Sequence, residues 1–150
     1  MKRQKKKYER PRRPWDKERI EKEREVMKNF GLRRKKEIWR AQAFLRKYRR
    51  IARELAAKKD KDKEKMMIKK LASFGLLQEN AVLDDVLSLS LENVLERRLQ
   101  TIIFRKGLAK TQKQARQFIV HRKVLLNSRK SIYPNYLVKK EEEDKIQVVK

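Results

Sequence analysis

The segment Leu95–Val149 reads LERRLQTIIFRKGLAKTQKQARQFIVHRKVLLNSRKSIYPNYLVKKEEEDKIQVV. Apolar residues recur in its first part at the spacing of one helix face, which predicts a helix that ends at Gly107. Thr111 and Gln114 have the spacing of a helix-capping pair, so a second helix is expected to begin there. The apolar positions of the two helices are Leu95, Leu99, Ile102, Ile103, Ala115, Phe118 and Ile119.

Short segments typical of β-strands follow these two helices. Strands are expected at residues 124–126, around Ile132, at 136–138 and at 146–149. Asn127-Ser128 is expected to form a turn, because Asn tolerates a left-handed backbone. Four consecutive acidic residues, 141–144, predict a solvated turn rather than a pair of catalytic carboxylates. The segment therefore predicts two helices packed on a small, mostly antiparallel sheet.

The chain upstream of residue 95 is predicted to be helical. Apolar residues at helical spacing predict helices at about 14–30, 36–59 and 66–74, and glycines end the first and the last of them. The expected buried residues of the first helix are Trp15, Ile20, Val26, Met27 and Phe30. The predicted fold class is α+β, mainly helical, with a basic N-terminal arm at 1–13, a helical lobe at 14–94 and a module at 95–150.

The net charge of this chain of 150 residues is +25 at pH 7. Residues 1–59 hold 25 basic and 8 acidic residues, residues 60–96 hold 5 and 8, and residues 97–150 hold 15 and 4. Such a charge opposes compaction unless a polyanion neutralises it, and it is typical of proteins that bind nucleic acid. Two cationic blocks therefore flank a slightly acidic, apolar segment.

The composition also excludes several kinds of site. There is no cysteine, which excludes disulfides, thiolate zinc sites and cysteine nucleophiles, and His121 is the only histidine. We expect no metal, no cofactor and no catalytic residue. No apolar run approaches the roughly 20 residues that span a bilayer, and the N-terminus lacks the apolar region of a secretory signal. We therefore expect an intracellular protein that binds neither membranes nor a second copy of itself.

Arginine-rich segments are the expected contacts for nucleic acid, because guanidinium groups donate paired hydrogen bonds to phosphate oxygens. In the first cationic block the candidates are Arg10, Arg12, Arg13, Arg33, Arg34, Lys35, Arg46, Arg49, Arg50 and Arg53. In the second block they are Arg97, Arg98, Arg105, Lys106, Lys110, Lys113, Arg116, His121, Arg122 and Lys123. An ion pair within the module is the alternative role for Arg98, and capping or packing is the alternative for His121.

Several short motifs of the second block resemble the S-four RNA-binding module. They are Arg98-Leu99, Gly107-Leu108-Ala109, Thr111, Ala115-Arg116 and Val124-Leu125-Leu126-Asn127. Upstream, YERPRRPWDKERI and FGLRRKKEIWRAQAFLRKYRRIAREL resemble the archaeal and eukaryotic branch of the family of the fourth small-subunit ribosomal protein. The resemblance covers nearly the whole chain.

This resemblance implies a structural protein of the small ribosomal subunit in the cytoplasm. It implies binding to the 5′ domain of small-subunit ribosomal RNA (rRNA) early in assembly. It also implies a place near incoming messenger RNA (mRNA), beside other small-subunit proteins including the fifth. The family usually has glycine where Ser128 stands, and glycine is also common at the position of Arg122. The cysteines with which some bacterial relatives bind zinc are absent.

The sequence alone does not exclude two other classes of function. An RNA-modifying or RNA-quality-control protein could carry the same module, although no Gly-rich cofactor loop and no second histidine supports an enzyme. A basic protein that binds DNA or anionic membranes is the other alternative. Comparing the affinity for structured rRNA, duplex DNA and anionic vesicles at matched salt separates these classes.

Overall fold

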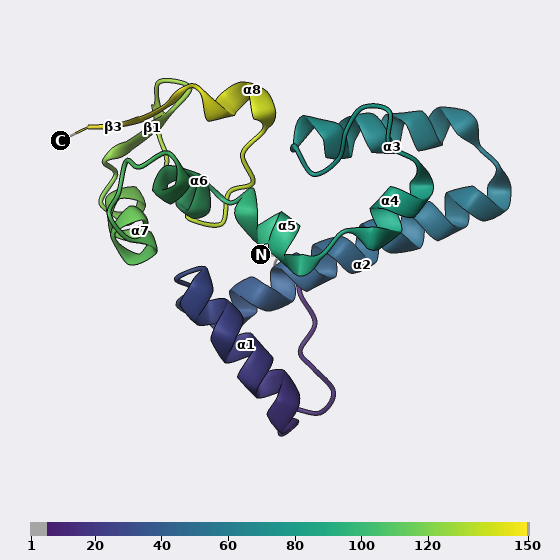
Figure 1. Ribbon diagram of the computed structural model, residues 1–150, viewed down its shortest axis with the longest axis horizontal. Helices are drawn as coiled ribbons and strands as arrows, with labels where there is room; N and C mark the ends of the chain where they lie inside the picture. Colours follow the sequence, from purple (N-terminus) through teal and green to yellow (C-terminus); the bar gives the residue numbers. More distant parts are fainter. Residues whose placement is uncertain (1–5, 150) are drawn as a thin grey trace, which may run out of the picture.

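Helices make up most of the computed structural model, which describes residues 6–149 (Figure 1). The helices are α1 (Lys17–Asn29), α2 (Lys35–Lys58), α3 (Lys61–Ser73), α4 (Leu83–Ser88), α5 (Leu91–Glu96), α6 (Leu99–Arg105), α7 (Gln112–Val120) and α8 (Lys140–Glu143). The strands are β1 (Val124–Leu126), β2 (Arg129–Lys130) and β3 (Ile146–Val148). The predicted α+β, mainly helical fold class is confirmed.

The long helix α2 is the axis of the N-terminal part of the fold, with α1, α3, α4 and α5 packed around it (Figure 1). Its buried apolar face consists of Ile38, Ala41, Leu45, Tyr48, Ala52 and Leu55. These residues recur every three or four positions, which is the helical spacing from which the sequence predicted a helix at about 36–59. The helix ends where Lys59 adopts a left-handed φ of 53° and donates its N–H to the carbonyl of Leu55.

The prediction of one continuous helix from Leu95 onward is wrong. Helix α5 ends at Glu96, Arg98 is extended with ψ 143°, and α6 begins at Leu99. Leu95 packs in the core around α2, whereas Leu99 packs in a second core, so the two residues belong to different clusters. We therefore propose residue 97 as the start of the C-terminal module, which we define as residues 97–149.

Backbone hydrogen bonds explain this break between α5 and α6. The N–H of Leu99 donates to the carbonyl of Tyr136 at 2.8 Å, and the N–H of Val138 donates to the carbonyl of Arg97 at 3.0 Å. Arg98 and Leu137 form an isolated antiparallel bridge. The strand predicted at 136–138 is therefore absent from the sheet, because its backbone groups pair with the helix junction instead.

In the C-terminal module, α6 and α7 pack on an antiparallel sheet with the strand order β2-β1-β3. The second core contains Leu99, Ile102, Ile103, Ala109, Ala115, Ile119, Val124, Val138 and Ile146. Thr111 caps α7 as predicted, because its hydroxyl accepts the N–H of Gln114 at 3.1 Å. The side chain of Gln114 accepts from the N–H of Lys110, not from that of Thr111, so only half of the expected capping box forms.

Further details differ from the sequence predictions. Trp15 is 72% exposed, because α1 is capped by Asp16 and Trp15 lies before the helix, off its inner face. Ile132 lies outside the strands, and Phe118 is only partly buried. The acidic residues predicted as a turn begin with a short helix, α8. None of these differences alters the two cores.

The turn between β1 and β2 uses two residues with left-handed backbone. Asn127 and Ser128 have φ values of 49° and 64°, and Leu126 pairs with Arg129 across them. Two positive φ values in a two-residue loop are the mark of a type I′ hairpin. Arg122, directly after α7, has φ 60°. A Cβ costs about 1–2 kcal/mol in this conformation, so Arg122 and Ser128 carry strain that glycine would not.

The carboxylate of Glu37, on α2, joins the two parts of the chain. One oxygen accepts from Arg98 Nη2 at 2.6 Å, and Arg116 approaches both oxygens, with Nη2 at 3.0 Å and Nη1 at 3.1 Å. The Glu37 side chain is 6% exposed and that of Arg98 is 4% exposed. Burial alone would raise the pKa of Glu37, but hydrogen bonds and charges from Arg116 and Arg98 outweigh burial and lower it.

A second joint lies beside this ion cluster. The buried amide of Gln100 donates to the carbonyls of Gly31 and Gln112, each at 3.0 Å, and so links the α1–α2 turn to the start of α7. Gly31 has φ 56°, and a Cβ there would lie 2.9 Å from the Cβ of Gln112. The close approach of the two segments thus requires glycine at this turn. Together the two joints fix the C-terminal module against α2.

We predict that Glu37→Gln destabilises the protein by about 3 kcal/mol or more, because it leaves the buried Arg98 guanidinium without a charge partner. Chemical denaturation at pH 7 measures the change. The matched control is Glu54→Gln on the same helix, whose 58% exposed carboxylate pairs with Arg50 and should contribute less than about 1 kcal/mol. Equal effects of the two variants would show that the cluster does not hold the fold together.

We predict that the stability difference between wild type and Glu37→Gln depends on pH. The pKa of Glu37 is lowered in the folded state, so its contribution is present above its unfolded pKa of about 4.3. The contribution is lost as the pH falls through the lowered folded pKa, because a protonated Glu37 resembles glutamine in charge. Denaturation curves of both proteins between pH 7 and pH 3 should therefore converge at the acidic end. A constant difference would contradict the lowered pKa.

We predict that Ser128→Gly stabilises the protein by about 0.5–1 kcal/mol. Glycine removes the strain of the left-handed backbone, and its larger unfolded-state entropy offsets part of that gain. Thermal melting measures the change. Ser131→Gly is the control, because Ser131 has no positive φ and glycine there brings only the entropic cost.

Candidate nucleic-acid interface

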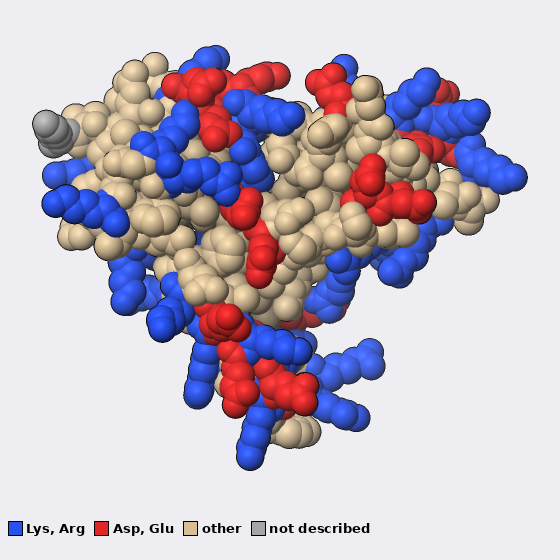
Figure 2. All heavy atoms as spheres, viewed as in Figure 1, with Lys and Arg blue, Asp and Glu red and all other residues tan. Residues whose placement is uncertain are grey.

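The predicted contact residues fall into three groups, and the residues of the largest group are exposed to solvent. Within residues 6–149 the side chains of this group form no ion pair. The group comprises Arg10, Arg12, Arg13, Arg33, Arg34, Arg53, Lys110, Lys113, His121, Arg122 and Lys123. In Figure 2, Lys and Arg side chains cover much of the C-terminal module and of α1. Phosphate groups can approach these cations without displacing a carboxylate.

In the module, the exposed cations lie at the two ends of α7. Lys110 and Lys113 flank the cap residue at the start of the helix, and His121, Arg122 and Lys123 follow its last residue. His121 is the C-cap residue, and its backbone N–H donates to the carbonyl of Gln117, which agrees with the capping alternative. Because the buried face of α7 is fixed in the second core, the cations at its ends have fixed positions too.

The predicted contacts did not include Arg129 and Lys130, two of the other cations of the module. Arg129 and Lys130 are exposed on β2, directly after the type I′ turn. The hairpin places them next to β1, which follows Lys123. An alternating pattern of apolar and polar residues could have predicted a strand at these positions. In a strand of only two residues that pattern is too short to recognise.

The N-terminal arm contacts the first half of α2 at Tyr8. Tyr8 packs against Trp39, with ring centroids 6.0 Å apart, and Lys36 lies over the Tyr8 ring. Trp39 donates its indole N–H to Glu23 at 3.0 Å. Trp39 is thus a packing residue that holds the arm.

A second group of predicted cations forms ion pairs at the surface. The pairs are Lys35–Glu23, Arg46–Glu9, Arg50–Glu54, Arg105–Glu96 and Lys106–Asp144. Except for Glu23, which is 4% exposed, the partners are accessible carboxylates. Exposed pairs contribute about 0–1 kcal/mol each, so a phosphate can replace the carboxylate at small cost. These residues remain candidates for contact with RNA.

A third group is committed to the protein itself. Arg98 is 3% exposed and bound to Glu37, so the prediction that it contacts RNA directly is wrong. Burial lowers the pKa of Arg98, while the charge of Glu37 and its hydrogen bond raise it. Arg116, also predicted to contact RNA, shares the same carboxylate. Arg97 donates to Glu143, and Arg49 donates to the carbonyl of Leu89 at 2.6 Å.

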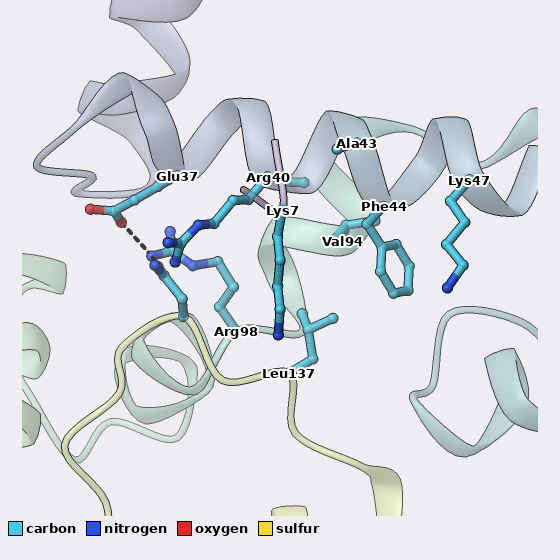
Figure 3. Close-up of a pocket in the computed structure, with 11 residues that line it drawn as sticks. Lys7, Glu37, Arg40, Ala43, Phe44, Lys47, Val94, Arg98 and Leu137 are labelled. Carbon is cyan, nitrogen blue, oxygen red and sulfur yellow. Dashed lines mark hydrogen bonds and ion pairs between the residues drawn. The ribbon is translucent and has the colours of Figure 1, made fainter. Parts of the chain in front are cut away.

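A hollow between α2 and the loop of residues 135–137 contains three cations that the sequence analysis missed (Figure 3). Lys7, Arg40 and Lys47 point into it. Arg40 and Lys47 are seven residues apart, so they lie on one face of the helix with Phe44 between them. The seven-residue spacing could have predicted from the sequence that these two cations share one face of α2.

Other kinds of site find no support in residues 6–149. No helix there is long and apolar enough to cross a membrane. In the same part of the chain, no group of three or more His, Asp or Glu side chains is arranged to hold a metal ion.

The chain is similar to known proteins over nearly its whole length. The model of the S4 domain matches residues 97–144. The chain is 52% identical to the small ribosomal subunit protein uS4 of Nanoarchaeum equitans, over 99% of this chain and 86% of that protein. Proteins of the same name from Korarchaeum cryptofilum and Methanococcus aeolicus are 49% and 52% identical, over 98% and 93% of this chain and 90% and 81% of theirs. The chain therefore belongs to the uS4 family of small ribosomal subunit proteins.

Proposed function

We propose that the chain is a structural constituent of the small ribosomal subunit in the cytoplasm and performs no catalytic step. It binds the 5′ domain of small-subunit rRNA early in assembly. It lies near incoming mRNA, with the fifth small-subunit protein among its neighbours. Membership of the uS4 family supports the ribosomal role, since relatives matched over nearly the whole chain carry that name.

The observation that carries the proposal is the fixed arrangement of two cationic surfaces. One lies along the arm and the start of α2, and the other lies at the ends of α7. The Glu37 cluster and Gln100 hold these surfaces at a set distance and angle. A rigid pair of cationic surfaces suits an RNA junction, because folded RNA is recognised largely by shape and backbone.

Binding in this proposal follows from charge neutralisation. Each phosphate that meets a Lys or Arg side chain releases condensed counterions, so affinity falls steeply as salt rises. Phosphate contacts of this kind set the register and orientation of the protein on the RNA. The net charge of +25 is consistent with many such contacts.

We predict that Arg122→Gly raises stability and weakens rRNA binding at the same time. Glycine relieves the left-handed backbone, for a gain of about 0.5–1 kcal/mol, while one phosphate contact is lost. The slope of log affinity against log salt should fall by about 1. Thermal melting and filter binding at several salt concentrations measure the two effects.

Ser128→Gly is the matched control for this variant, because it gives the same backbone relief without loss of charge. It should stabilise the protein and leave the salt slope unchanged. If Arg122→Gly binds rRNA with the wild-type affinity and slope, Arg122 does not belong to the interface.

The proposed binding region is tested by hydroxyl-radical footprinting of the protein on full-length small-subunit rRNA. Protection should appear in the 5′ domain at protein concentrations that leave the other domains unprotected. Uniform protection, or protection confined to another domain, would contradict the proposal.

A further inference from the structure

The hollow between α2 and the loop of residues 135–137 has a volume of about 660 Å³ (Figure 3). Pockets that hold small molecules or single ligand groups have volumes of roughly 300–1,000 Å³. The hollow lies between the helical part of the chain and the C-terminal module, so it exists only when the two are docked. Its two ends differ in chemistry.

One end is polar and positively charged. Arg98 lies there with its Nη1 atom buried and without a hydrogen-bond partner in the described part of the chain. Both oxygens of Glu37 are already occupied by Arg98 and Arg116. Figure 3 shows Arg40 converging on the same end. Arg98, Arg116 and Arg40 thus surround a single carboxylate, so this end has a surplus of positive charge.

The other three cations of the hollow differ from Arg98, because none of them has a carboxylate partner among the described residues. Among residues 6–149, the side chains of Lys7, Arg40 and Lys47 form no ion pair or hydrogen bond. Arg46 and Arg50 of the same helix differ in this respect, since each pairs with a glutamate. Cations that line a hollow without a carboxylate partner of their own are suited to bind anions.

The middle of the hollow is apolar and flat. Phe44 and Leu137 line it from opposite sides, one from α2 and the other from the module (Figure 3). The Phe44 ring also packs against Tyr48, with centroids 4.6 Å apart, and against Phe74 at 6.4 Å. These contacts hold the ring in place, so it offers a fixed surface for a planar group.

We propose that this hollow takes one unpaired nucleotide of the bound RNA. The base lies against Phe44 and Leu137, and its own phosphate is held by Arg40 at the polar end. Lys47, on the other side of Phe44, faces a neighbouring phosphate of the same strand. The inference rests on the proposed function and deepens it by naming a nucleotide-sized site on the protein. A fatty acyl chain would leave the cations without a partner, and an acidic peptide would make little use of the aromatic surface.

Ultraviolet crosslinking of the full chain to small-subunit rRNA tests this proposal. After nuclease and trypsin digestion, the peptide of residues 41–46 should carry a nucleotide adduct, and Phe44 is its only aromatic residue. Phe44→Leu keeps an apolar side chain but removes the flat ring. The adduct should disappear in this variant, and affinity for rRNA should fall about tenfold.

The variant Arg40→Gln/Lys47→Gln tests the charged part without altering the core. Its affinity for rRNA should fall about tenfold. The matched control is Lys61→Gln/Lys65→Gln, which removes the same charge from exposed positions of α3 outside the hollow. The control should bind within about twofold of wild type if position matters more than net charge. Thermal melting of all variants separates loss of binding from loss of folding.

The outcomes distinguish this inference from the proposed function. If wild type protects rRNA but shows no adduct on residues 41–46, and the double variant binds like its control, the hollow holds no nucleotide although the ribosomal function stands. If the protein does not bind rRNA at all, both proposals fail. The last experiment is a titration of the protein with adenosine and uridine monophosphates. Saturation of the hollow by these free nucleotides, without an adduct from RNA, would overturn the assignment to an RNA nucleotide.

Discussion

The buried carboxylate of Glu37 is the contact on which the rest of the structure depends. It accepts hydrogen bonds from two guanidinium groups of the C-terminal module, Arg98 from the turn before α6 and Arg116 from α7. Loss of either partner by substitution would leave a charge unpaired in a region that water barely reaches. The two cationic surfaces therefore keep one relative orientation, which is what recognition of RNA shape requires.

Arginine serves two opposite purposes in this chain. Arg98, Arg116 and Arg97 hold the protein together, whereas Arg33, Arg34 and similar exposed residues are available to phosphate. The difference lies in the partner: a guanidinium beside a buried carboxylate is neutralised locally, and one in solvent is not. Composition counts both kinds alike, so the net charge of +25 overstates the charge available to RNA.

Local sequence rules predicted much of the fold correctly. The buried stripe of α2 and the cap at Thr111 follow from helical spacing and side-chain chemistry within a few residues. The break between α5 and α6 was missed because its cause lies some 40 positions away, in the backbone of Tyr136 and Val138. Trp15 was misplaced because helical spacing does not reveal that α1 begins only after Asp16.

The sequence by itself determined the fold class, the polyanion-binding character and the family resemblance, because these depend on local periodicity, total charge and short motifs. Only the tertiary structure decided which cations face solvent. Glu37 reads as an ordinary first-turn acid of α2, yet it removes Arg98 and Arg116 from the exposed surface. Arg40, Phe44 and Lys47 become one site only where the module packs against them. Pairing and enclosure depend on contacts between distant segments, and no local pattern encodes those distances.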